Sequence, residues 1–113
     1  MTGASNEEIT MAEETLGLQF ADDYRQYLAV LGVASFDGHE LTGICNLKRL
    51  DVVTVTVNER PVNCTVQPDW YVLEQTGIDS ITIWQSSSGE VYLCHGVRTP
   101  VKIADSLIDY LNE

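Results

Sequence analysis

The stretch SITIWQSSSGEVYLCHG, which spans residues 80–96, has two runs rich in β-branched and aromatic residues on either side of three serines and a glycine. Both runs, SITIWQ and EVYLC, follow the alternating pattern of a strand. The SSSG segment between them has the small polar residues of a tight turn. The sequence therefore predicts an antiparallel hairpin with strands at 80–85 and 90–95.

Successive side chains of a strand point to opposite faces of the sheet, so the side chains of this hairpin fall into two sets. The apolar face is expected to join the core, and its members are Ile81, Ile83, Val91 and Leu93. The other face consists of Thr82, Trp84, Glu90 and Tyr92. Large aromatic and polar groups mix in this way on protein-binding surfaces, although a helix that covers the face would account for them equally well. Trp84, Glu90 and Tyr92 are the first candidates for binding a partner.

Two helices are predicted before the sheet from their capping residues and apolar stripes. Ser5 and Glu8 have the spacing of a capping box, and Gly17 supplies a left-handed stop, so the first helix is expected at 6–16. The second is expected at 22–31, where aspartates in the first turn favour the helix dipole and apolar residues recur at helical spacing.

The remaining segments predict further strands and a terminal helix. WYVLEQ is expected to be a strand at 70–75, and residues 39–44 can form a short strand after a turn. In KIADSLIDYLNE the apolar residues recur at helical spacing after Pro100, which predicts a helix at 102–112. This stripe consists of Ile103, Leu107, Ile108 and Leu111.

Residues 51–60, DVVTVTVNER, support two interpretations. Val53, Val55 and Val57 alternate with threonines, which is the pattern of a strand. In a helix, Leu50, Val53 and Val57 would share one face, and each valine would cost only a few tenths of a kcal/mol relative to alanine. The local pattern favours the strand.

Length, charge and cysteine content limit the kind of protein that this chain can be. With 113 residues, it is expected to form a single domain over 1–113. Its 17 acidic and 6 basic residues give a formal net charge of −11, which disfavours nucleic acid and membrane partners and favours a basic protein. Neither an apolar leader nor the run of ~20 apolar residues that spans a membrane is expected. Cys45, Cys64 and Cys94 are odd in number and widely spaced, which is typical of free thiols in the cytoplasm.

The serine-rich turn and the two histidines lack the arrangements that catalysis requires. A phosphate loop or a nucleophile elbow joins a strand to a helix, whereas SSSGE leads into another strand. Cys94 and His95 are adjacent, so on a strand they project to opposite faces and cannot share a metal. His39, near Asp37 and Glu40, has no second histidine at metal-ligand spacing. No catalytic residue, metal or cofactor is therefore expected, and the acidic loop with Asp37 and Glu40 is the second candidate for partner binding.

The first half of the chain has a series of landmarks with a familiar order. ITMAEETLGLQFADDYRQYLAVLG resembles the opening of the SUKH superfamily, in which an Ile and Glu helix precedes L-G-x-x-[LF]-P-x-[DE]-[YF]-x-x-[FY]-L and a glycine. Ala21 stands where that pattern usually has proline. The matching residues are Ile9, Glu13, Leu16, Gly17, Phe20, Asp23, Tyr24, Leu28 and Gly32.

The second half is similar to the same superfamily, so that the resemblance covers nearly the whole chain. Trp70 opens the strand WYVL, and SSSGEVYLC stands where the family has an acidic turn and G-x-V-Y, although no aspartate precedes Gly89. IADSLIDYL resembles the terminal helix I-A-x-S-[FL]-x-x-[FYL]-L. The family usually has a short helix where this chain has DVVTVTVNER, so the resemblance implies a helix at 51–60.

The SUKH superfamily includes the Smi/Knr cell-wall regulator domain and many bacterial toxin-immunity proteins. The resemblance implies an α+β fold with a mainly antiparallel sheet, N-terminal helices and a C-terminal helix packed on it. It also implies a non-enzymatic immunity protein that binds and neutralises a cognate toxin, commonly a nuclease or deaminase domain, in the cytoplasm. The alternative is a regulatory or scaffold domain that docks on a signalling or cell-wall-related protein.

Overall fold

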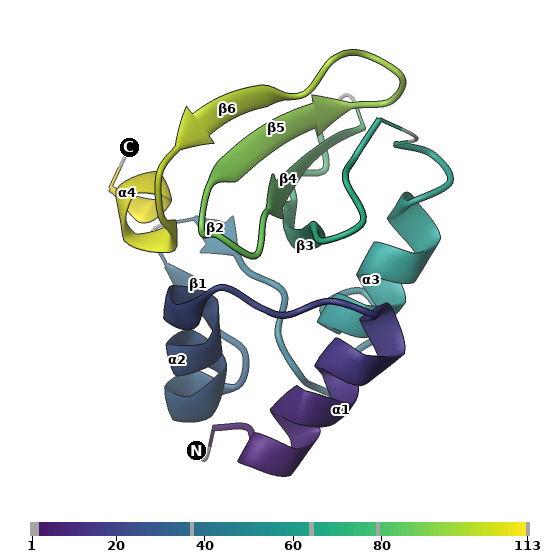
Figure 1. The fold of residues 1–113 in the computed structure, drawn as a ribbon. Coiled ribbons are helices and arrows are strands. Elements are labelled where there is room, and N and C mark those ends of the chain that lie inside the picture. The colour runs from purple at the N-terminus through teal and green to yellow at the C-terminus, as the bar shows by residue number, and fades with distance from the viewer. Residues whose placement is uncertain (1–2, 37, 64, 79, 113) are drawn as a thin grey trace.

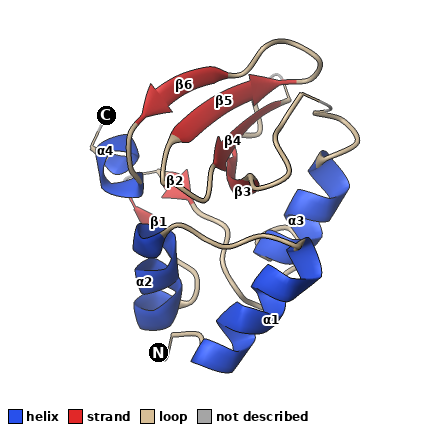
Figure 2. Cartoon of the chain, in the orientation of Figure 1, coloured by secondary structure: helices blue, strands red, loops and turns tan. Residues whose placement is uncertain are grey.

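The computed structural model describes residues 3–36, 38–63, 65–78 and 80–112. Two helices, a small hairpin and a third helix precede four strands and a final helix (Figures 1 and 2). The helices are α1 (Asn6–Leu16), α2 (Asp22–Leu31), α3 (Val52–Glu59) and α4 (Leu107–Leu111). The strands are β1 (Ser35–Phe36), β2 (His39–Glu40), β3 (Tyr71–Gln75), β4 (Ile81–Gln85), β5 (Val91–His95) and β6 (Val101–Ala104). The chain thus has the α+β fold that the sequence predicts.

The four longer strands form one antiparallel sheet in the order β3-β4-β5-β6, and β1 pairs with β2 in a separate hairpin. Strands β3, β4 and β5 confirm the predictions at 70–75, 80–85 and 90–95. Figure 1 shows α2 close to α4, and α1 beside α3 on the other side of the molecule. The strand expected at 39–44 is shorter than predicted, because only His39–Glu40 belongs to a strand and Leu41 makes a single bridge to Glu74.

The first two helices begin and end where their capping residues predict. The N–H of Glu8 donates to Ser5 Oγ over 3.1 Å, and the N–H of Ser5 donates to Glu8 Oε1 over 2.9 Å, which completes the capping box. Gly17 closes α1 in the left-handed conformation, at φ 71°. Gly32 follows α2, and its N–H donates to the carbonyl of Leu28.

The two faces of the four-stranded sheet carry separate clusters of buried side chains. The first face packs against α1, α2 and α4, and its strand residues include Tyr71, Leu73, Ile83 and Val91. The second face carries a smaller cluster, which consists of Val55, Trp70, Val72, Trp84 and Cys94. Helix α3 belongs to both clusters, because Val52 packs into the first and Val55 into the second. Among the predicted core residues of the hairpin, Ile83 and Val91 are buried, while Ile81 and Leu93 are half-buried.

Val52–Glu59 form a helix, so the strand favoured by the local pattern is wrong and the helix that the resemblance implies at 51–60 is confirmed. Asp51 caps this helix, because its Oδ2 accepts the N–H of Thr54 over 3.2 Å. Val52, Val55 and Thr56 lie at helical spacing and are buried. Burial of two valines gives about 1.5–3 kcal/mol each, which exceeds the small helix penalty of the β-branched residues.

The helix predicted at 102–112 is wrong in its first half. Residues Val101–Ala104 form β6, which pairs with β5, and the helix covers only Leu107–Leu111. Val101 and Ile103 fit a strand period, and β5 supplies the neighbouring strand that completes their hydrogen bonds. Pairing with β5 therefore overrides the helical spacing between Ile103 and the apolar residues that follow it.

Helix α4 begins after Ser106, a capping residue that lies within the segment predicted to be helical. Ser106 Oγ accepts the N–H of Asp109 over 3.1 Å, which is the N-cap bond. Leu107 is buried as predicted, whereas Leu111 is half-buried and Ile108 is exposed. Within the described ranges, no helix has both the length and the apolar character that a membrane crossing needs.

Candidate partner-binding surface

Trp84 does not lie on the surface, so its assignment as a partner-binding residue is wrong. Its side chain has no exposed area and packs with Val55, Val72 and Cys94. The indole N–H donates to Thr82 Oγ1 over 2.8 Å, which satisfies its polar group inside the protein. A helix covers this face, as the alternative interpretation of the hairpin allowed, because α3 contributes Val55 to the cluster.

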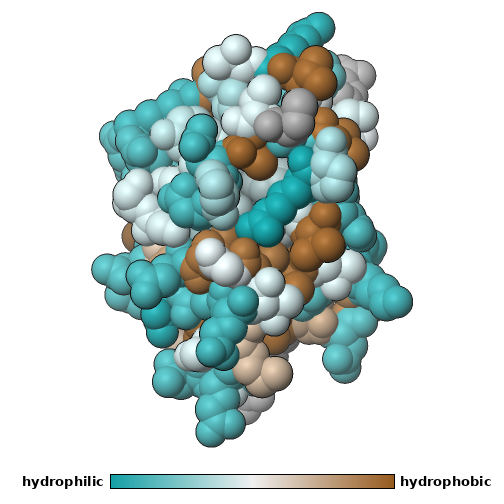
Figure 3. All heavy atoms as spheres, turned by 45° about the vertical axis from the view of Figure 1, so that its right-hand side comes forward, coloured by the Kyte–Doolittle hydropathy of each residue, from teal (hydrophilic) through white to brown (hydrophobic). Residues whose placement is uncertain are grey.

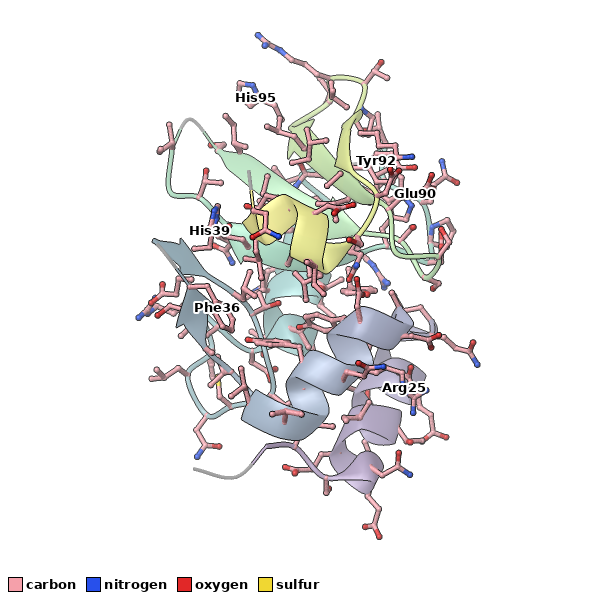
Figure 4. All side chains as sticks on the ribbon, turned by 90° about the vertical axis from the view of Figure 1, so that its left-hand side faces the viewer. Arg25, Phe36, His39, Glu90, Tyr92 and His95 are labelled. Carbon is pink, nitrogen blue, oxygen red and sulfur yellow. The ribbon has the colours of Figure 1, made fainter. Side chains whose placement is uncertain are left out.

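Tyr92 and Glu90 do lie at the surface of the sheet, where Figure 4 shows them next to each other. The ring of Tyr92 stacks on Trp70 with centroids 4.1 Å apart, and its hydroxyl donates to Glu90 Oε1 over 3.1 Å. Lys102 Nζ lies 2.9 Å from Glu90 Oε2 and 2.6 Å from Asp105 Oδ1. The hydrogen bond from Lys102, followed by that from Tyr92, lowers the pKa of Glu90. The negative charge of Glu90 is thus already balanced within the chain.

Glu40, the described carboxylate of the second candidate site, is also paired within the chain. Asp37 lies outside the described residues. Glu40 receives two hydrogen bonds from the guanidinium of Arg49, and this pair raises the pKa of Arg49. His39 Nδ1 lies 3.0 Å from Glu74 Oε1, the carboxylate that also accepts the hydroxyl of Tyr110. His39 and Glu40 therefore hold β2 against the sheet.

Glu74 reaches this position through an irregularity in β3. The register of β3 on β4 shifts between Val72 and Glu74, so Glu74 pairs with Ile83 and turns toward the first face. There the side chain is 6% exposed, and its Oε2 accepts the N–H of Glu40 over 3.2 Å. Buried carboxylates require such partners, because an unpaired charge away from water is costly. This cluster joins β2, β3 and α4, and its role is structural.

Cys94 and His95 occupy opposite sides of β5, as expected for adjacent residues of a strand. Cys94 is buried, and that burial raises the pKa of its thiol to about 12, so the thiol is protonated at neutral pH. His95 is half-buried, and Figure 4 shows it far from His39. Cys45 is half-buried, and Cys64 lies outside the described residues. Over the described ranges, no three His, Cys, Asp or Glu side chains are grouped so that they could hold a metal ion.

The serines of the hairpin turn hold the turn in place. Ser86 Oγ and Ser88 Oγ share a hydrogen bond of 2.8 Å. The N–H of Ser87 donates to Asp69 Oδ2 over 3.1 Å, and its hydroxyl donates to the carbonyl of Gln19. These bonds connect the β4–β5 turn to the segment before α2 and to the residue before Trp70.

Carboxylates without a basic partner gather on α1, in contrast to both predicted sites. Glu7, Glu8 and Glu14 are exposed on α1, and no described Lys, Arg or His side chain forms an ion pair with them. Asp51, at the start of α3, has no such ion pair either. The uncompensated negative charge near the surface of α1 and α3 thus lies outside both predicted binding sites.

A shallow groove of about 240 Å³ lies between α1, α3 and the chain that enters α3. We call it the α1–α3 groove, and it is lined by Glu8, Met11, Ala12, Thr15, Ile44, Asp51 and Val53. Figure 3 views the molecule with the α1 and α3 side turned forward, and apolar surface appears there among polar side chains. A second hollow of about 350 Å³ adjoins it, since Glu8 and Ile44 line both. The two hollows therefore share part of their lining.

The path of residues 41–51 builds this groove. Gly43 donates to the carbonyl of Leu50, and the next residue, Ile44, donates to the carbonyl of Gly32. A Cβ on Gly43 would lie 2.1 Å from the Gly32 oxygen, so only glycine permits this approach. Ile44 is thereby placed beside α1. The one sequence signal for the groove is Met11, an apolar residue of α1 that is outside its buried stripe and 65% exposed.

Comparison with known proteins yields one family. A family model, SUKH_5, described as SMI1-KNR4 cell-wall, matches residues 1–113. No curated protein matches the chain.

Proposed function

Because this chain belongs to the SMI1-KNR4 family of the SUKH superfamily, we propose that it is an immunity protein that binds and neutralises a cognate bacterial toxin. The proposed action is protein–protein binding in the cytoplasm of the producing cell. The proposed toxin carries a basic domain, such as a nuclease or a deaminase.

The charge distribution is the observation that supports a basic partner. The formal net charge is −11, and the described basic side chains that make ion pairs do so with carboxylates of this same chain. What remains is an excess of exposed carboxylates. These attract a cationic protein over distances comparable to the Debye length, which is ~8 Å at physiological salt. Proteins that act on nucleic acids usually have such a cationic face.

The test is coexpression of this chain with the toxin domain encoded by a neighbouring gene. We expect cells to survive and the two proteins to copurify as a complex. A toxin domain from an unrelated gene cluster is the control, and it should kill cells whether or not this chain is present. Unchanged killing by the neighbouring toxin, with this chain folded and abundant, would refute the immunity function and leave the regulatory or scaffold alternative.

Binding kinetics test the electrostatic part separately. Attraction between the acidic chain and a basic toxin domain should raise the association rate above the ~10⁵–10⁶ M⁻¹s⁻¹ of uncharged encounters. Salt should lower this rate steeply and change dissociation much less. An association rate that does not respond to salt would contradict the proposal that charge guides the encounter.

A further inference from the structure

We propose that the α1–α3 groove is the docking site for the toxin, and that it receives an aliphatic side chain flanked by lysine or arginine. This inference rests on the proposed function and names the surface that carries it out.

The floor and one wall of the groove offer apolar area that the fold leaves open. Met11 on α1 lines the groove and is 65% exposed. Ile44 and Val53 also line the groove and are half-buried. An aliphatic side chain that enters here would remove apolar surface from water on both partners, which favours binding.

The rim of the groove supplies negative charge with free acceptor capacity. Glu8 uses Oε1 to accept the N–H of Ser5, and Asp51 uses Oδ2 to accept from Thr54. No described residue donates a hydrogen bond to the other oxygen of either carboxylate, which leaves that oxygen for a donor from outside. Glu7 and Glu14 lie about one turn before and after Met11 on α1, and both add negative charge. Among the described residues that line the groove, the charged ones are Glu8 and Asp51, so the rim is negative.

Charge also decides between the possible occupants of the groove. A second copy of this chain also has a net charge of −11, so the carboxylates at the rim would repel it. A basic segment gains from both the apolar floor and the rim. The surface around Tyr92 offers less, because Lys102 already neutralises Glu90 and the Tyr92 ring is already stacked on Trp70.

The decisive experiment compares two alanine variants with matched exposure. Met11 in the groove is 65% exposed and Ile108 on α4 is 64% exposed, so neither truncation should unfold the chain. We expect Met11→Ala to weaken binding to the neighbouring toxin domain by about tenfold, mainly through faster dissociation. Ile108→Ala should change the affinity less than about twofold. Unfolding curves for both variants confirm that each is native.

A second pair separates local charge from net charge. Glu14→Lys on α1, three residues after Met11, and Asp109→Lys on α4 alter the net charge by the same amount, and both side chains are exposed. Long-range attraction falls equally in both, so any additional slowing of association in Glu14→Lys reports proximity to the docked partner. We expect the Glu14→Lys rate to be at least about threefold lower than the Asp109→Lys rate.

The outcomes distinguish the groove from the proposed function. If the parent chain binds the toxin domain and Met11→Ala binds as tightly as Ile108→Ala, the groove is not the docking site, but the proposed immunity function stands. If the parent chain binds no toxin, both proposals fail. If light scattering shows that the chain alone dimerises and that Met11→Ala dissociates the dimer, the occupant is a second copy and the docking proposal is overturned.

Discussion

The two faces of the four-stranded sheet are closed by different means. The first face is joined to α2 and α4 through buried polar groups as well as apolar packing, since Tyr71, Gln85 and Asp23 form a hydrogen-bonded chain there. The second face is closed by aromatic and aliphatic packing around Trp84. Side chains on the second face should therefore act mainly through volume, and those on the first through hydrogen-bond partners as well.

Trp84→Ala should have the largest effect, because it removes the fully buried side chain at the centre of the second face. We expect a loss of about 3–5 kcal/mol in the free energy of unfolding, measured by urea denaturation. Tyr92→Ala is the control, since this half-buried ring should lose about 1 kcal/mol. Equal losses in the two variants would show that the second face is not a core.

Leu107→Ala tests the apolar packing of the first face. Leu107 is 4% exposed in the main core, so truncation should lower the free energy of unfolding by about 2–5 kcal/mol. The adjacent Ile108 is exposed, and Ile108→Ala should lower it by less than about 0.5 kcal/mol. A loss below about 1 kcal/mol for Leu107→Ala would mean that α4 does not close the core.

Ala21→Pro tests the polar network of the first face by restoring the residue usual in the family pattern. The φ of Ala21 is −62°, which suits proline, and a compatible proline usually stabilises by about 0.4–1 kcal/mol. Here, however, the N–H of Ala21 donates to the hydroxyl of Tyr71 over 2.9 Å, and that hydroxyl donates to Gln85. Proline removes the donor and directs its ring carbon at the Tyr71 oxygen. We therefore expect a net loss of about 1–2 kcal/mol in thermal or urea unfolding.

The double variant Ala21→Pro with Tyr71→Phe sharpens this test. Removal of the hydroxyl gives the proline ring room, so the double variant should lose less than the sum of the two single losses. Additive losses would show that positions 21 and 71 are independent.

Cys94→Ala should lower the free energy of unfolding by about 1 kcal/mol at neutral pH, because it removes one small buried group, and should have a distinct effect in alkali. Burial raises the pKa of its thiol from 9.0 to about 12 in the folded chain. The unfolded chain therefore loses this proton first as the pH rises, and the stability contribution present below pH 9 declines between about pH 9 and 12. Cys94→Ala should reduce this alkaline loss in unfolding curves. Tyr27, whose pKa burial also raises to about 12, contributes in both proteins and cancels in the comparison.

Local signals made α1, α2 and the β4–β5 hairpin predictable. A capping box, helix-ending glycines and a serine turn act within a few residues, so the sequence contains their cause. The helix at 51–60 was predicted only through the family resemblance, because burial of Val52 and Val55 against distant strands overrides the local strand pattern. Strand β6 was not predicted because its pairing with β5, and not its local sequence pattern, determines that it is a strand.

The candidate site was less predictable than the fold. Alternation correctly separated Trp84 and Tyr92 from the main core, yet it could not indicate that α3 covers Trp84. Nor could spacing reveal that Arg49 and Lys102 would neutralise Glu40 and Glu90. These facts depend on contacts between residues far apart in the sequence.

The position of β6 at the edge of the sheet bears on aggregation. Within the described residues, its outer side faces no further strand, and Val101 on it is 58% exposed. An open, apolar edge can add a strand from another copy of the chain. Lys102 stands in the middle of this four-residue strand, and burying its ammonium between two sheets would require loss of its hydration and of its two carboxylate contacts. The lysine that balances Glu90 thus also helps to keep neighbouring copies of the protein from joining edge to edge.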